Sequence, residues 1–264
     1  MISELFDKVY VINLKESPDR LKQIKDQLEI IGLYDYIVWE AVNGRKDDVK
    51  FNITDYNKDM EGWNIGSAGL VYTTIAILKH AKRNGYESIL ILEDDLIFDT
   101  EKLEYAERGF KSVTSDWEMF HFTATHFKEP TKFNKFLYTI TGAWSCQMYA
   151  VNSNMYDLYL KHLLRVDLPI DVITSYIIQP RGNTYSLREN LIITEPNFST
   201  IRNEYIDHHE YVEDVTKPKP EPVIEEMPVE VQEEIVNDRK GIESDNSSSG
   251  LQKAVDKFLK FIKF

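Results

Sequence analysis

The chain has 264 residues, 42% of them hydrophobic, which is enough for one α/β domain with a sizeable core and an appendage. Its formal net charge of −13 argues against a nucleic-acid binder, because such proteins neutralise phosphates with Lys and Arg. The single cysteine, Cys146, excludes an intrachain disulfide and a zinc site made of several cysteines within one chain. It favours a reducing compartment, and a buried position is expected for it.

The first part of the chain alternates apolar strands with amphipathic helices. Ser17 is a candidate helix cap, Pro18 suits a first helical position, and Gly32 suits a helix end. The pattern predicts strands at 8–14, 36–42 and 88–98, and helices at 18–31 and 67–86. Because these strands are apolar on both faces, we expect a mostly parallel sheet covered by helices on both sides. In such sheets, ligands bind outside the carboxyl ends of the strands.

The second part of the globular region is less regular. Its pattern predicts strands at 116–124 and 142–151, a helix at 152–165, a helix or strand at 171–179, and a strand running into a loop at 191–201. The globular domain is expected to span residues 1–212.

The C-terminal part changes character twice. Residues 213–250 are rich in Glu, Pro and Ser, which predicts a disordered acidic linker. Residues 251–264 place apolar side chains on one side of a helix and lysines on the other, as in helices that lie on an anionic membrane surface. The alternative is docking on its own domain or on a partner helix. Without a signal peptide or a spanning segment, we expect a cytoplasmic protein, peripheral at the inner face of a membrane.

Three adjacent carboxylates, Glu93, Asp94 and Asp95, end the apolar run SILILEDDLIF. A strand buried on both faces carries charge only where it leaves the sheet, so the cluster is expected in the ligand crevice. Carboxylate oxygens select Mg²⁺ or Mn²⁺, which would offset the mutual repulsion. Strand alternation places Glu93 and Asp95 on one face and Asp94 on the other. The alternative is a set of capping or turn acids.

Four segments resemble glycosyltransferase family 25, which includes lipooligosaccharide and collagen-type galactosyltransferases. They are VYVINLKESPDRLKQI near the start, EAVNG after the second strand, SILILEDDLIF, and LPIDV near residue 170. The family also carries a Gly-Cys-x-x-Ser-His element, and here Gly66 begins the stretch GSAGLV, which does not have the Cys, Ser and His at the corresponding positions. The resemblance covers residues 8–201, nearly the whole globular part.

The resemblance implies a GT-A fold, which is Rossmann-like, and inverting transfer of a hexose, typically galactose from UDP-galactose. Asp95 would then coordinate Mn²⁺ or Mg²⁺ at the diphosphate. Glu93 or Asp94 would contact the ribose or a metal-bound water, with Glu93 also a candidate metal ligand. Asn13 and Arg20 lie at and after the end of the first strand, where the nucleotide would bind, and Arg20 would pair with phosphate.

The loop after the second strand adds two candidate donor-binding residues, Asn43 and Gly44, where glycine permits close approach of the backbone to a ligand. In LPIDV, Asp171 is the candidate base that takes the proton of the acceptor hydroxyl, with a helix N-cap as its alternative. His208 in DHHE is a candidate late metal ligand, and surface histidines without a role are the alternative.

Two aromatic residues, Trp144 and Tyr149, could form a platform for a sugar, although core packing is the usual role of such residues in a strand. The sequence therefore predicts a metal-dependent glycosyltransferase that takes a nucleotide sugar and a saccharide or glycolipid acceptor. The alternative is a catalytically inactive binding protein with the same fold, suggested by the missing Cys, Ser and His.

Overall fold

The computed structural model describes residues 2–54, 57–58, 65–144, 146–193, 197–199 and 204–206. The chain divides into two units, Met1–Pro220 and Glu221–Phe264. The predicted linker and C-terminal helix lie outside the described residues, so both stay predictions, as does the domain boundary at residue 212. Within the described part of the chain, no helix combines the length and the apolar character needed to cross a bilayer.

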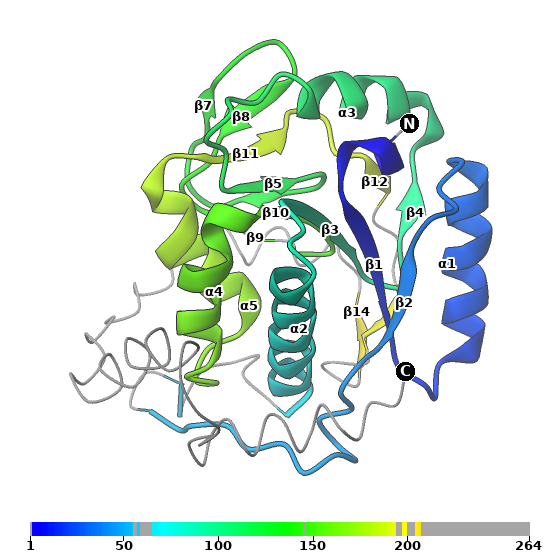
Figure 1. Cartoon of the computed structure of the whole chain (residues 1–264), viewed down its shortest axis with the longest axis vertical. Helices are drawn as coiled ribbons and strands as arrows, with labels where there is room; N and C mark the ends of the chain where they lie inside the picture. The colour runs from blue at the N-terminus through cyan, green and yellow to red at the C-terminus, as the bar shows by residue number, and fades with distance from the viewer. Residues whose placement is uncertain are drawn as a thin grey trace. The chain divides into compact units, whose positions relative to one another are not determined.

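An eight-stranded sheet forms the centre of the first unit, in the order β2-β1-β3-β10-β5-β11-β8-β7 (Figure 1). Its strands are β1 (Lys8–Asn13), β2 (Ile37–Glu40), β3 (Ser88–Leu92), β5 (Met119–His121), β7 (Thr131–Lys132), β8 (Leu137–Thr139), β10 (Met148–Asn152) and β11 (Thr184–Leu187). All strands except β8 and β10 point in one direction. The predicted α/β class, with a mostly parallel sheet flanked by helices, is confirmed.

Helices cover both faces of this sheet. They are α1 (Pro18–Ile30), α2 (Ile65–Arg83), α3 (Leu103–Phe110), α4 (Tyr156–Leu163) and α5 (Ile170–Ile173). Strand alternation sends Val9 of β1 into the core that contains Leu28 of α1, whereas Tyr10 bonds to His80 of α2 on the opposite face. Figure 1 shows α2, α4 and α5 together on the face opposite α1.

Shorter elements complete the fold. Three two-stranded ribbons pair β4 (Ile97–Phe98) with β12 (Ile192–Ile193), β6 (Thr125–His126) with β9 (Ala143–Trp144), and β13 (Asn197–Ser199) with β14 (Glu204–Ile206). The short helices are η1 (Ile2–Leu5), η2 (Thr100–Lys102), η3 (Ser153–Met155), the π-helical η4 (Thr174–Ile178), and η5 (Gln179–Arg181).

The predicted strand at 88–98 is interrupted. β3 ends at Leu92, and the chain turns through the three carboxylates before β4 begins. The predicted strand at 142–151 is likewise two strands, β9 and β10, and the ambiguous segment 171–179 is helical. Gly32 ends α1 with a left-handed φ of 69°, as expected. Ser17 occupies the N-cap position of α1, as expected, but its side chain makes no capping bond; its carbonyl accepts from Asn13 Nδ2 at 3.1 Å.

His162, in the last turn of α4, makes the folded state sensitive to acid. Burial, with help from the cations Lys161 and Arg165, lowers the pKa of His162 to about 4. The unfolded chain binds this proton near pH 6.5, so the free energy of unfolding falls as the pH drops from about 6.5 towards 4. Because the ring is only half-buried, we expect this decrease to be about 2 kcal/mol. Urea unfolding at both ends of this range should show the loss in the wild type and a smaller loss in His162→Gln. Equal losses in the two proteins would contradict this assignment.

Candidate active site

The order of strands reverses at β1, which places a crevice at one edge of the sheet. From β1 the chain passes through α1 to β2 on one side, and then through α2 to β3 on the other. The three strands are parallel neighbours, so their last residues, Asn13, Glu40 and Leu92, all lie at the same edge of the sheet. Open α/β sheets bind ligands at such a switch point, outside the carboxyl ends of the strands.

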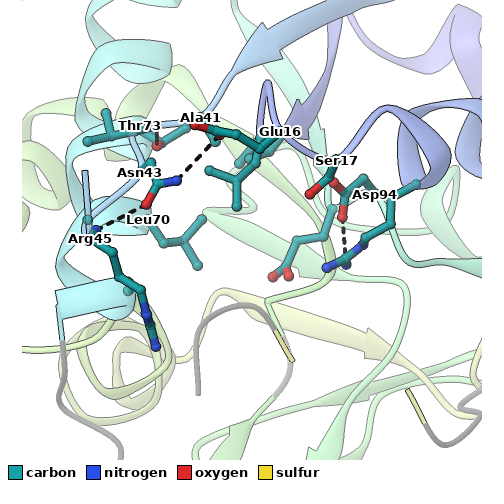
Figure 2. A pocket seen from close by; sticks show the side chains of 15 residues that line it. Glu16, Ser17, Ala41, Asn43, Arg45, Leu70, Thr73 and Asp94 are labelled. Atoms are coloured by element: carbon teal, nitrogen blue, oxygen red, sulfur yellow. Dashed lines mark hydrogen bonds and ion pairs between the residues drawn. The ribbon is translucent and has the colours of Figure 1, made fainter. Parts of the chain in front are cut away.

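A cavity of about 250 Å³ lies at this edge (Figure 2). Its wall is formed by residues at the carboxyl ends of β1, β2 and β3 and in the segments that follow them, including the start of α1, together with residues of α2. They are Ile12, Leu14, Glu16, Ser17, Arg20, Ala41, Val42, Asn43, Gly44, Arg45, Gly66, Leu70, Thr73, Glu93 and Asp94. Figure 2 shows Asp94 on the opposite side of the cavity from Asn43 and Arg45. The cavity thus combines two arginines with several carboxylates and a helix N-terminus.

Arg20 joins the acidic turn to α1. Its guanidinium lies 2.6 Å from Asp94 Oδ1 and 2.7 Å from Asp95 Oδ2. Asn13, buried at the end of β1, donates to Asp94 Oδ2 at 2.6 Å. Three predicted donor-binding residues therefore meet in one hydrogen-bonded group, and Asn13 acts from behind the cavity wall by fixing the carboxylate of Asp94.

The predicted alternation of the acidic residues is wrong. Because β3 ends at Leu92, the turn rather than the strand pleat sets the directions of the carboxylates. Glu93 and Asp94 line the cavity together, whereas Asp95 lies outside the wall and reaches it through Arg20. The turn interpretation of these acids is correct for their backbone, but their side chains still lie at the ligand crevice.

Crowding of carboxylates makes this turn hard to ionise fully. Burial raises the pKa of Glu93 well above its usual range, and the neighbouring carboxylates of Asp95, Asp171 and Asp94 raise it further. Burial also raises the pKa of Asp94 to about 6, against the opposing effect of Arg20. The turn is therefore a place where an added cation is electrostatically favoured.

The loop after β2 is held against the start of α2. Val42 N donates to Thr73 Oγ1 at 2.9 Å, and Thr73 donates onward to the carbonyl of Gly69 at 2.8 Å. A Cβ placed on Gly44 would lie 1.7 Å from the carbonyl oxygen of Ile65, so only glycine fits there. The close approach in the structure is to the backbone of α2, and the predicted approach of Gly44 to a ligand stays a prediction.

Asn43 organises the polar side of the cavity. Its Oδ1 accepts from the backbone N–H of Arg45 at 3.0 Å, and its Nδ2 lies 3.4 Å from Glu16 Oε2. Glu16 also pairs with Lys46 at 2.7 Å, which lowers the pKa of its carboxyl. Asn43 therefore holds the backbone at Arg45 and the charged side chain of Glu16 at the edge of the cavity.

Asp171 lies in the first turn of α5, beside the acidic turn. Its Oδ1 accepts from the backbone N–H of Cys146 at 3.0 Å, and its charge contributes to the raised pKa of Glu93. Pro169 occupies the N-cap of α5, so the alternative role of Asp171 as an N-cap is wrong. Asp171 does not line the cavity, but it is close to Glu93, which does.

The remaining candidate residues do not lie together at the cavity. Tyr149 is only 1% exposed and belongs to the core, so a platform role for it is wrong. Trp144 is half-buried and stacks on Phe127 outside the central sheet. Cys146 is a free, buried thiol, as expected. His208 lies outside the described residues, so its role as a metal ligand stays a prediction.

Sequence reasoning missed several residues of the wall. Glu16 and Arg45 each lie a few residues after the end of a strand, within the segments NLKES and NGR, and this position was the available signal. Leu70 occupies the position of the family's Ser in the stretch that begins at Gly66, and it lines the cavity as an apolar side chain. No sequence pattern could show that Leu70 faces the ligand crevice.

A divalent cation fits this site by donor chemistry. Within the described residues, no group of three or more His, Cys, Asp and Glu side chains is arranged to hold a metal ion. Mg²⁺, however, is usually bound through one or two carboxylates together with substrate phosphates. Asp94 and Asp95 supply hard oxygen atoms that now contact Arg20. A bound cation would take over contacts that this guanidinium makes.

Comparison with protein-family models agrees with the resemblance seen in the sequence. A family model described as glycosyltransferase family 25 (LPS biosynthesis protein) matches residues 6–187. No match was found among curated proteins. One similar solved structure is described as "crystal structure of a glycosyltransferase involved in the glycosylation of the major capsid of PBCV-1". It shares 11% identity and a TM-score of 0.43, over 79% of this chain and 98% of that chain.

Proposed function

The chain belongs to glycosyltransferase family 25, and on this premise we propose that it transfers galactose from UDP-galactose to a saccharide or lipid-linked acceptor with inversion. The observation that carries the proposal is the cavity at the strand ends of β1, β2 and β3, which brings Arg20, Arg45 and the acidic turn together. The family description as LPS biosynthesis protein suggests an acceptor from lipopolysaccharide assembly.

The donor diphosphate would lie between the arginines and the first turn of α2. Arg20 and Arg45 can each donate several hydrogen bonds to phosphate oxygens. The N-terminus of α2 adds a partial positive charge, and its residue Gly66 lines the cavity. Asn43 and Gly44 would contact the nucleoside from the loop after β2.

Asp95 and Glu93, with His208, would hold Mn²⁺ or Mg²⁺ beside the diphosphate. The cation would supply positive charge that offsets the negative charge developing on the departing UDP. Burial is the first cause of the raised pKa of Glu93, and the neighbouring carboxylates raise it further; the negative charge of these neighbours is what a cation would offset. Asp94, fixed by Asn13, would orient the turn for both ligands.

Asp171 would be the base. The acceptor hydroxyl oxygen bonds to the anomeric carbon as the bond to UDP breaks, and its proton passes to the carboxylate of Asp171. The hydrogen bond from Cys146 N to Asp171 Oδ1 fixes the orientation of that carboxylate. Its nearness to Glu93 places it on the side of the acidic turn. The proposal also includes the place of the reaction: residues 251–264 would hold the enzyme at the cytoplasmic face of a membrane.

Calorimetric titration of the protein with UDP, with and without Mn²⁺, tests the donor and metal assignments. We expect Mn²⁺ to strengthen UDP binding to the wild type at least about tenfold and to have little effect in Asp95→Ala. Asp26→Ala is the matched control, because Asp26 is an exposed acid of α1 paired with Lys22. It should retain the full response to Mn²⁺.

Two results would count against the proposal. An unchanged Mn²⁺ response in Asp95→Ala would remove Asp95 from the metal site. UDP binding without any release of galactose to water or to an acceptor would favour the alternative of a binding protein, which the missing Cys, Ser and His suggest.

A further inference from the structure

The geometry points to a saccharide-binding subsite made by Phe127, Trp144 and Tyr176, which would hold a pyranose ring of the acceptor beside the acidic turn. This inference rests on the proposed function and names the acceptor's contact surface. Trp144 ends β9, Phe127 directly follows its partner strand β6, and Tyr176 lies in η4. Three separate segments thus contribute one ring each.

The three rings form a single cluster. The Phe127 and Trp144 rings stack with centroids 4.5 Å apart and planes inclined by 29°. The Tyr176 ring lies 5.7 Å from Phe127 and 5.9 Å from Trp144. Broad aromatic faces are the surfaces on which the C–H faces of pyranose rings pack, while hydroxyl groups at the rim find polar partners.

Core packing does not account for these rings. All three are half-buried, although the chain buries other aromatic residues completely. The nearest small core contains only Ala124, Ile140 and Ala143, with Tyr138 packed against it. Trp144 Nε1 is shielded and has no hydrogen-bond acceptor among the described residues, which is uncommon for a buried donor. A ligand hydroxyl would supply that acceptor.

Lys128 provides the polar rim of the subsite. Its side chain lies across Gly142, where an added Cβ would approach Lys128 Cγ to 2.7 Å. The amine lies 5.9 Å from the centroid of the Tyr176 ring. Lys128 is exposed, so its ammonium group can donate to hydroxyl oxygens of a sugar stacked on the rings.

A short stretch of backbone connects this aromatic cluster to the acidic turn of the proposed reaction site. Gln147, three residues after Trp144, accepts through its carbonyl from Glu93 N at 2.9 Å. Three residues span at most about 11 Å, so the cluster lies within the reach of a short saccharide from the acidic turn. Tyr176 also shares a continuous helical run with Asp171, the proposed base, and its π-helical turn is a feature that often marks functional sites.

Saturation-transfer NMR on the full chain without donor tests the subsite. The probes are the methyl β-glycosides of glucose, galactose and N-acetylglucosamine at millimolar concentration. At least one should receive saturation at its ring protons from the wild type. We expect the signal to fall at least about fivefold in Trp144→Leu and Tyr176→Leu and to persist in Tyr176→Phe, which keeps the ring face.

Phe133→Leu is the matched control, because Phe133 is an exposed aromatic residue between β7 and β8. It should leave the signal unchanged. UDP binding should be equal in wild type and Trp144→Leu, which separates this inference from the proposed donor site. Absence of saturation from the wild type for all three glycosides, an unchanged signal in Trp144→Leu, or equal loss in Tyr176→Phe and Tyr176→Leu would each overturn the stacking subsite.

Discussion

Gly44→Ala is expected to destabilise the domain by about 3 kcal/mol and to weaken UDP binding at least about tenfold. The new methyl group would lie 1.7 Å from the Ile65 carbonyl oxygen, and the neighbouring atoms belong to backbone that cannot rotate away. The loop after β2 would have to leave the first turn of α2. Because Asn43, Gly44 and Gly66 all line the cavity, this movement would change its shape directly.

Gly85→Ala is the matched control for this prediction. Gly85 follows α2 with a φ of 69°, and nothing lies within 4 Å of an added Cβ. Its replacement should cost about 1 kcal/mol through backbone conformation alone, and UDP binding should be unchanged. Urea unfolding and calorimetry with UDP measure both quantities. Near-equal stability losses in the two variants, or normal UDP affinity in Gly44→Ala, would show that the close packing is not essential to the site.

The parts of the fold that were predictable are those where one physical signal dominates. β1 and β3 are buried on both faces, so they appear as continuous apolar runs that need no knowledge of their partners. β11 is also completely buried, but it is four residues long and three of these carry a hydroxyl group, TYSL. Its place in the sheet depends on pairing with β5 and β8, which the local sequence does not encode.

The same limit applies to the site. The carboxyl end of β3 was a predictable location for ligand-binding acids, since buried strands carry charge only where they leave the sheet. Which acid faces the cavity was not predictable, because it depends on the turn that follows Leu92. The contact of Arg20 with Asp94 and Asp95 was also inaccessible, because it joins α1 to a turn far along the chain.

Arg20→Met is expected to destabilise the domain by about 2 kcal/mol and to weaken UDP binding at least about tenfold. Arg20 contacts two partly buried carboxylates, and its loss leaves Asp94 and Asp95 beside Glu93 without their cation. Breaking a buried ion pair commonly costs 3–5 kcal/mol, roughly, and the 22% exposure of Arg20 reduces this figure. Methionine keeps the apolar stem of the side chain, so the loss reports on charge.

A second substitution separates charge compensation from simple loss of packing. In Arg20→Met, the further change Asp94→Asn removes one of the unpaired charges while it retains an oxygen that can accept from Asn13. We therefore expect the double variant to recover at least half of the lost stability, and the double-mutant cycle to give a coupling of about 1 kcal/mol or more. UDP binding should not recover, because the guanidinium that would contact the diphosphate is still absent.

The exposed pair of Arg108 and Glu104 on α3 provides the matched cycle. Its side chains are 62% and 77% exposed, so Arg108→Met and Glu104→Gln should couple by less than about 0.5 kcal/mol. If the Arg20 cycle gave a coupling no larger than this, Arg20 would not be the cation that holds the acidic turn together. A large coupling combined with restored UDP binding would instead assign Arg20 a purely structural role and leave Arg45 and α2 as the diphosphate contacts.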